Sequence, residues 1–319
     1  TSKNFDWVHH ETFNMLDFWM SNFARNLNTI RNGKSIKELK ILDNSIIDYK
    51  SKETAIVIGG GPTVKRKNQL KLIKKSRYSG TIVCTDRMLI PFLKEGFFPR
   101  KKTKIFVVTV DPAEVIAKFF DDKILNKFKQ NISIVLSTCC SPEVVKKCKK
   151  NNLDVFWFHP LIDDYRKNVS ITKTMNMMVK NKKNPKGLPG LQTGGNSGAA
   201  AWIFSWSILG KSPIGLIGLN FGYDTDSPVE ETPHYKSLLK ANDFDEIKTR
   251  GNFKKIHNKD FNCDTFVDPI FQYYREALKD LVVRTPKWVK TINATEGGSL
   301  FGKNIVGMKL SDFLTKYKK

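Results

Sequence analysis

One stretch restricts the fold more than any other: an apolar run that leads directly into three consecutive glycines. Residues 55–58 read Ala-Ile-Val-Ile, and Gly59, Gly60, Gly61, Pro62 and Thr63 follow without a spacer. Glycine accepts backbone conformations that other residues avoid, and proline suits the first turn of a helix. Free N–H groups at such a turn attract phosphate. The stretch therefore predicts a buried strand, a phosphate-binding turn and a helix, and a turn that binds nothing is the alternative.

Apolar strands alternate with helical segments through most of the chain. The expected strands are residues 55–58, 80–84, 105–110, 132–136, 154–158, 214–219 and 288–292. Strands that are apolar along their whole length and separated by helices indicate a parallel sheet covered on both faces. The predicted fold class is α/β and Rossmann-like, with a mostly parallel sheet, helices on both faces and an N-terminal helical extension.

The pattern also suggests a division of the chain. Residues 1–50 have helical character and are interpreted as the N-terminal extension, and residues 51–319 as the Rossmann-like domain. Residues 223–265 are charged and irregular, which predicts an insertion or lid within that domain.

Polar side chains follow several of the expected strands. Ligands bind at the carboxyl ends of strands in parallel sheets, so Asp86, Asp111, Glu114 and His159 are expected at the same edge as the glycine turn. Asp111 and Glu114 predict a Mg²⁺ site, a ribose contact or an acid–base pair. A helix cap is the alternative for both residues.

Further polar groups lie in the second half of the chain. Gly195, Asn196, Ser197 and Gly198 form a second glycine-rich entry to a helix, where Asn196 and Ser197 either bind a nucleotide or cap the helix. Asn220 and Tyr223 follow the strand at 214–219, and Glu296 lies in a late polar loop where it binds substrate or forms a turn. His234 and His159 are the candidates for a general base, because imidazole titrates near neutrality; a structural role is the alternative for each.

The amino-acid composition indicates which binding partners and which cellular location to expect. The net charge of +23 favours anionic ligands, but the lysines are spread along the chain and mixed with asparagine, which indicates a solvated surface rather than a nucleic-acid groove. This composition suggests an AT-rich genome and an archaeal source. Five cysteines without zinc spacing predict reduced thiols and no metal site. No apolar run reaches the ~18 residues of a membrane span, and no signal peptide is recognised, so a cytoplasmic protein is expected.

Five segments together resemble the MptE-like superfamily, formerly a domain of unknown function. They are residues 58–63, 110–114, 194–198, 217–222 and 293–298. This superfamily includes archaeal 6-hydroxymethylpterin diphosphokinases and the bacterial motility accessory factor (Maf) glycosyltransferases, and the resemblance spans about residues 50–310. It implies a Rossmann-like core similar to one group of bacterial sialyltransferases, which bind a cytidine nucleotide-sugar through a glycine turn and a later Ser-Gly helix entry. Gly59, Gly61, Pro62, Thr63 and residues 196–198 match those positions.

The two activities of the superfamily imply different chemistry. Asp111-Pro-Ala-Glu114 is closer to the glycosyltransferase branch than to the acidic Asp-x-Asp-Gly run of the diphosphokinases. The resemblance implies a transferase that takes a CMP-nonulosonate type of sugar to a sugar or protein hydroxyl, with Asp111 in the catalytic set and His234 or His159 as the base. No cofactor is expected for this reaction. The alternatives are a pterin diphosphokinase using Mg-ATP and a non-catalytic protein that binds a nucleotide or nucleic acid.

Overall fold

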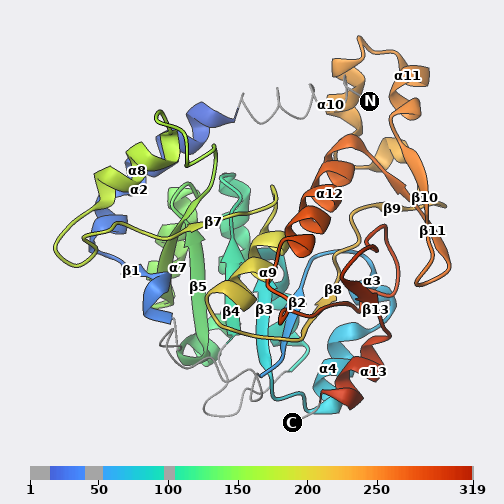
Figure 1. Cartoon of the computed structure of the whole chain (residues 1–319), viewed down its shortest axis with the longest axis horizontal. Coiled ribbons are helices and arrows are strands. Elements are labelled where there is room, and N and C mark those ends of the chain that lie inside the picture. The colour runs from blue at the N-terminus through green and yellow to red at the C-terminus, as the bar shows by residue number, and fades with distance from the viewer. Residues whose placement is uncertain (1–14, 40–52, 97–104, 318–319) are drawn as a thin grey trace.

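A mostly parallel sheet forms the centre of the molecule (Figure 1). The structure, a computed structural model, describes residues 15–39, 53–96 and 105–317. The order of the strands across the sheet is β1-β6-β5-β4-β3-β2-β8-β12-β13, with β7 paired to β6. Every pairing described within this sheet is parallel.

The strands of this sheet are β1 (Lys34–Ser35), β2 (Ala55–Ile58), β3 (Thr81–Thr85), β4 (Ile105–Thr109), β5 (Ile132–Ser137), β6 (Asp154–Pro160), β7 (Gly190–Leu191), β8 (Ile214–Ile217), β12 (Thr291–Asn293) and β13 (Ile305–Gly307). The α-helices that pack on it are α2 (Leu16–Asn32), α3 (Thr63–Arg66), α4 (Gln69–Ser76), α5 (Asp86–Lys94), α6 (Ile124–Phe128), α7 (Pro142–Lys150), α8 (Ile171–Val179), α9 (Ser197–Ser207), α12 (Pro269–Val283) and α13 (Leu310–Lys316).

The sheet is covered on both faces because its strands are apolar on both faces. Successive side chains of a strand point to opposite sides. Ile56 and Ile58 accordingly belong to one hydrophobic cluster, with residues of α2, α4, α5, α7, α8 and α13. Ala55 and Val57 belong to a second cluster, with residues of α9 and α12. The predicted fold class is confirmed.

Helix α9 lies across the middle of the second face, and its sequence explains why. Ala199, Ala200 and Ala201 are fully buried, and the helix packs on β2, β3, β4 and β8. Small side chains allow this close approach of the helix to the sheet. The N-terminus of α9 is thereby held near the carboxyl ends of the central strands.

The N-terminal segment contributes more than a covering helix. Helix α2 matches the expected helical character, and Lys34–Ser35 then add strand β1 beside β6. The Asn22 and Asn26 amides donate to the carbonyl oxygens of Cys139 (3.3 Å) and Cys140 (2.8 Å) in the loop after β5. The described part of the segment is therefore an integral part of the sheet and its cover; residues 1–14 and 40–50 of the predicted extension lie outside the described residues.

The charged segment after β8 folds around its own small sheet. Strands β9 (Tyr223–Asp224), β10 (Lys254–Asn258) and β11 (Cys263–Val267) pair antiparallel in the order β10-β11-β9. The short 3₁₀ helix η4 (Val229–Glu231) and helices α10 (Tyr235–Ala241) and α11 (Glu246–Gly251) complete the segment, which lies beyond the N-terminal end of α12 (Figure 1). An ion pair of 2.7 Å between Arg66 and Asp224 connects it to α3.

Two helical segments differ from the sequence prediction. The sequence after β4 suggests one helix over residues 113–129, but the structure divides it into η2 (Glu114–Phe120), α6 and η3 (Lys129–Asn131). The Asp122 carboxylate accepts a hydrogen bond from Ile124 N (2.9 Å) at the start of α6. Residues 165–192 are rich in lysine and asparagine, and the sequence predicts a loop at residues 184–190. Helix α8 precedes this loop, and Ser170 caps the helix by accepting from Lys173 N (3.1 Å). Lysine and asparagine content concealed the apolar face of this helix.

The strand order reverses between β2 and β8. From β2 the chain moves outward through β3, β4, β5 and β6, and it then returns to place β8 and β12 on the other side of β2. In doubly wound sheets a ligand binds at the carboxyl ends of the strands where the order reverses. The fold therefore makes the turn after β2 and the residues after β8 the expected place for a ligand.

Candidate functional site

The glycine turn after β2 brings the ends of β2 and β8 unusually close. Gly59 N donates to the carbonyl oxygen of Ile217 and Gly61 N to that of Gly218, each at 2.8 Å. A Cβ atom on Gly59 would lie 2.6 Å from the Gly218 oxygen, and one on Gly61 would lie 2.1 Å from the Asn220 side-chain oxygen. Two of the three glycine amides are thus used to join the strands, whereas Gly60 N has no hydrogen-bond partner among the described residues.

Thr63 and Asn220 stabilise this junction. The Thr63 hydroxyl donates to Asn220 Oδ1 (3.0 Å), and both side chains are buried. The carbonyl oxygen of Asn220 accepts from Ser299 N (2.8 Å), which attaches the loop after β12. Their assignment as nucleotide ligands stays a prediction, and the structure shows them bonded to one another.

The N-terminus of α9 abuts the same junction. Cβ atoms on Gly59 and Gly198 would both lie within 2.5 Å of the Leu219 side chain, so the two glycine-rich segments are direct neighbours. Asn196 caps α9 by accepting from Ala199 N (2.9 Å), and Ser197 Oγ accepts from Val110 N (3.3 Å) at the end of β4. The structure therefore unites the two glycine-rich entries that the sequence singled out.

Two carboxyl groups follow β3 and β4. Asp86 is buried (6% exposed); it accepts from Arg87 N (2.6 Å) and from the Thr109 hydroxyl. Burial raises the pKa of Asp86 to about 6, and the nearby charge of Asp111 acts in the same direction. Asp111 Oδ1 accepts from Ala113 N (2.8 Å) in a local turn, and Glu114 is an exposed residue at the start of η2.

His159 lies in a different environment. It is 1% exposed at the end of β6, and its Nδ1 lies 3.0 Å from the Thr138 hydroxyl. Burial lowers the pKa of His159 to about 4, so the ring is neutral at physiological pH. Four strand spacings, about 19 Å, separate β6 from β2. His159 therefore lies far from the glycine turn after β2, and we do not include it in the candidate site.

His234 forms a hydrogen-bonded group with two residues distant in sequence. Its Nδ1 lies 2.6 Å from Asp268 Oδ2, and the Tyr223 hydroxyl donates to the same oxygen at 2.6 Å. The Asp268 side chain is fully buried, whereas that of His234 is 25% exposed. Burial raises the pKa of Tyr223, and the charge of Asp268 acts in the same direction. The carboxylate therefore fixes the imidazole through Nδ1 and leaves Nε2 without a partner among the described residues.

Helix α12 connects this group to the glycine-rich entry of α9. Asp268 caps α12 by accepting from Phe271 N (2.7 Å), and the Phe271 ring lies 5.4 Å from that of His234. One turn further, the Tyr274 ring contacts Gly195, which has a φ of 78° and where a Cβ atom would lie only 2.6 Å from the ring. Burial raises the pKa of Tyr274 to about 12, and the charges of Asp111 and Asp268 contribute. Tyr274 is thus close enough to both Asp268 and Asp111 for their charges to act on it.

Glu296 has a structural partner. Its Oε1 accepts from Leu310 N (3.1 Å) at the start of α13, and the residue itself has a φ of 58°. The positive φ agrees with the turn alternative for Glu296, the contact with α13 adds a partner that the sequence did not predict, and substrate binding stays a prediction.

Sequence reasoning missed three residues of this region: Asp268, Tyr274 and Arg87. Asp268-Pro269 is a typical start of a helix, so the helix cap could be predicted from the sequence, whereas the contact between Asp268 and His234 could not. Arg87 directly follows Asp86 and lies against Gly60, where a Cβ atom would be 2.9 Å from the arginine Cδ.

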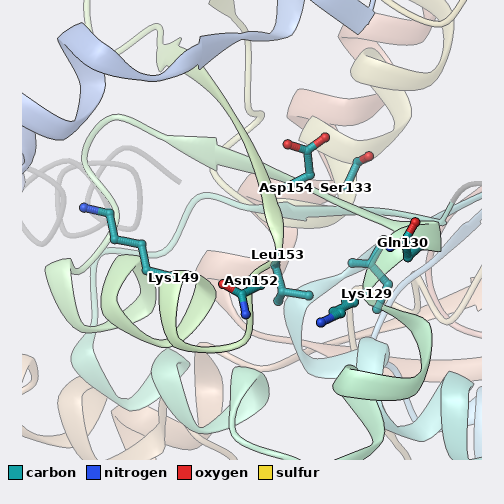
Figure 2. Close-up of a pocket in the computed structure, with 8 residues that line it drawn as sticks. Lys129, Gln130, Ser133, Lys149, Asn152, Leu153 and Asp154 are labelled. Carbon is teal, nitrogen blue, oxygen red and sulfur yellow. The ribbon is translucent and has the colours of Figure 1, made fainter.

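A separate open hollow lies at the opposite edge of the sheet (Figure 2). It is lined by residues near the amino ends of β5 and β6, among them Lys129, Ser133, Lys149 and Asp154. It shares no residue with the predicted site. Over the described ranges, no three His, Cys, Asp or Glu side chains are placed to hold a metal ion, and no helix is long and apolar enough to cross a membrane.

Comparison with known families decides the relationship. The family model described as 6-hydroxymethylpterin diphosphokinase MptE-like matches residues 21–226, more than half of the chain. The chain belongs to the MptE-like family. The match begins within α2, so it includes part of the N-terminal segment that the sequence resemblance left outside, and it ends just after β9.

A solved structure of another protein shows a similar fold. The structure of the Maf glycosyltransferase from Magnetospirillum magneticum AMB-1 aligns with 91% of this chain at a TM-score of 0.53 and 13% identity. This MptE-like chain spans 41% of the length of that protein. At this identity the likeness concerns the fold. No curated protein matches the chain.

Proposed function

We propose that this MptE-like protein is a nucleotide-dependent transferase, and specifically a glycosyltransferase that uses a sugar activated as a CMP-nonulosonate. The observation that carries the proposal is the pairing of His234 with buried Asp268 at 2.6 Å. Transfer to a hydroxyl group requires a base for its proton. An aspartate that holds Nδ1–H of a histidine leaves Nε2 as the proton acceptor and stabilises the imidazolium that forms.

The crevice between β2 and β8 is the proposed location of the nucleotide. The amide of Gly60 has no protein partner within the described residues, and the eleven-residue helix α9 begins beside the same turn. The positive end of the helix dipole favours a phosphate there. Tyr274 contacts Gly195 at the entry of α9 and is influenced by the charge of Asp268, the partner of His234, so we assign the sugar and its acceptor to the side of α9 that faces the insertion.

A second candidate is the pterin diphosphokinase named in the family description. The favouring observation is that Asp86 and Asp111 follow the carboxyl ends of the neighbouring parallel strands β3 and β4, where the charge of Asp111 also acts on the pKa of Asp86. Mg²⁺ is commonly held by one or two carboxylates together with substrate phosphates. Both oxygens of Asp86 already accept hydrogen bonds, so Asp111 is the residue that would hold the ion, and Mg²⁺ would neutralise charge on the phosphates of ATP.

A thermal-shift panel tests the proposal. The purified protein is heated with CMP, CDP, UDP, GDP, AMP or ATP, each with and without Mg²⁺. A ligand at 100 times its Kd stabilises the native state by about 2.7 kcal/mol. We expect stabilisation by CMP without a metal requirement. Stabilisation by ATP and AMP alone, dependent on Mg²⁺, would favour the diphosphokinase, and no shift with any nucleotide would refute both candidates.

A second assay tests the chemistry. Release of CMP from CMP-N-acetylneuraminic acid and related activated nonulosonic acids is followed with and without acceptor sugars. His234→Ala is expected to abolish release while CMP binding is retained. Equal release by the variant and the native protein would remove His234 from the proposed mechanism.

A further inference from the structure

The arginine after β3 occupies a central place at the proposed nucleotide crevice. Arg87 lies in the first turn of α5, and its aliphatic chain runs over Gly60: a Cβ atom on this glycine would lie 2.9 Å from Arg87 Cδ and 3.8 Å from Nε. Gly60 therefore leaves open the space that this side chain fills. The arginine is held directly beside the one amide of the glycine turn that has no partner in the described part of the chain.

A second contact orients the guanidinium group. Its central carbon lies 5.8 Å from the centre of the Phe119 ring. Arginine is attracted to aromatic faces, and its weakly hydrated planar group remains able to donate hydrogen bonds in the ring plane. Gly60 and Phe119 together keep the side chain extended along the edge of the sheet, between the ends of β2 and β4.

The guanidinium group is not neutralised by a salt bridge. Among the described residues, no carboxylate lies within ion-pair distance of Arg87, although its charge favours the ionised forms of Asp86 and Asp111. Asp86 uses its oxygens for the Thr109 hydroxyl and for the backbone N–H of Arg87. Asp111 accepts from Ala113 N. The Arg87 side chain is exposed, and its five N–H donors have no protein acceptor among the described residues.

We propose that Arg87 binds the phosphate group of the nucleotide, together with the amide of Gly60. This inference rests on the proposed function and assigns the phosphate contact within it. Guanidinium and phosphate pair through two parallel hydrogen bonds, so the arginine also fixes the orientation of the phosphate.

The assignment gives Arg87 a part in the transfer step. The bond between the anomeric carbon and the phosphate oxygen breaks, and its electron pair stays on that oxygen, so the departing CMP gains one negative charge. The acceptor oxygen forms the new bond to the anomeric carbon, and its proton moves to His234 Nε2. A fixed cation at the phosphate stabilises the charge that develops there.

A matched pair of variants tests the assignment. Arg77 and Arg87 flank the same strand, because Arg77 ends α4 before β3 and Arg87 follows β3 in α5. Arg77→Ala therefore removes an equal charge at the opposite edge of the sheet. Binding of CMP and of cytidine, which lacks the phosphate, is measured by calorimetry for the native protein, Arg87→Ala, Arg87→Lys and Arg77→Ala. ATP with Mg²⁺ is a second probe.

We expect Arg87→Ala to bind CMP about 10- to 100-fold more weakly, the loss typical of a hydrogen bond to a charged group, with cytidine binding unchanged. Arg87→Lys should retain part of the affinity, since it keeps the charge without the two parallel bonds. Arg77→Ala should match the native protein. Native-like CMP and ATP affinity in folded Arg87→Ala would overturn the assignment while the proposed function stands. Failure of the native protein to bind either nucleotide would instead overturn the proposed function and this inference with it.

Discussion

Replacement of Gly61 by alanine tests whether the glycine turn exists to let two strands meet. The added Cβ atom would lie 2.1 Å from Asn220 Oδ1 and 2.6 Å from the Gly218 carbonyl oxygen. The Asn220 side chain can turn away only by giving up the hydrogen bond from Thr63. The backbone oxygen can move only by shifting the Gly61–Gly218 pairing.

The expected cost follows from these contacts. Overpacking of a close-packed site costs about 1–3 kcal/mol, and loss of a buried hydrogen bond adds about 1 kcal/mol. The reduced entropy of the unfolded chain returns about 0.4–1 kcal/mol. We therefore expect Gly61→Ala to lower the free energy of unfolding by about 2–3 kcal/mol. This is measured by urea unfolding, and the dependence of the free energy on urea concentration should not change.

Gly251→Ala is the matched control. This glycine ends α11, and a Cβ atom there would meet nothing within 4 Å. Its unfolding free energy should stay the same or rise by up to about 1 kcal/mol. If Gly61→Ala proves as stable as Gly251→Ala, the close approach of β2 and β8 does not depend on glycine, and our explanation of the turn is incorrect.

Three further predictions concern single side chains. Asp268→Asn should lower the rate of CMP release about 10²- to 10⁴-fold with CMP affinity retained. The reason is that the asparagine amide would donate to His234 Nδ1 and leave the proton on Nε2. A pH–rate profile equal to that of the native protein would argue against the role of the His234–Asp268 pair. Asp86 has a pKa of about 6 in the fold against 3.8 for an unperturbed aspartate, so the folded protein binds the proton more tightly and stability is lost as pH rises from about 4 to 6. The free energy of unfolding of Asp86→Asn, measured with urea, should therefore rise by up to about 3 kcal/mol relative to that of the native protein between pH 4 and pH 7. A difference between the two proteins that stays constant over this pH range would contradict the assignment. Glu296→Ala should lower the unfolding free energy by about 1 kcal/mol through loss of the contact to Leu310 with CMP binding unchanged; weaker binding at unchanged stability would restore its predicted role in substrate binding.

The sequence predicted the central part of the fold because that part depends on local patterns. A short continuous apolar run followed by glycines fits few structures other than a buried strand and a turn, so residues 55–58 and 214–219 were recognisable as strands. The rule that ligands bind at the carboxyl ends of parallel strands placed Asp86 and Asp111 at one edge, and both do follow the neighbouring parallel strands β3 and β4; their role in a site stays a prediction. Strand β13 and the split of the helix after Glu114 were missed, since both depend on loop contacts rather than on periodicity.

The details of the site depend on contacts that no local pattern encodes. His234 and Asp268 are 34 residues apart, in a segment whose charged sequence concealed a small sheet and two helices. His159 and His234 looked equivalent as single histidines, yet one is buried beside Thr138 and the other is held by a carboxylate near the surface. The same limitation applied to Glu296, because its partner Leu310 belongs to a helix formed later in the chain.

The carboxyl ends of the strands form one edge of the sheet, and the two halves of this edge differ in their unpaired hydrogen-bond donors and acceptors. Beyond β5, the loop carbonyls of Cys139 and Cys140 are covered by the α2 amides of Asn22 and Asn26, so that half is closed by the protein itself. In the other half, the Gly60 amide after β2 and the Arg87 guanidinium after β3 have no protein hydrogen-bond partner among the described residues, and His234 Nε2 has none in the insertion after β8. Two are donors suited to an anion and the third is a proton acceptor. A nucleotide phosphate and an acceptor hydroxyl would together satisfy all three groups, and this is the support that the unpaired groups give to our proposal of transfer chemistry.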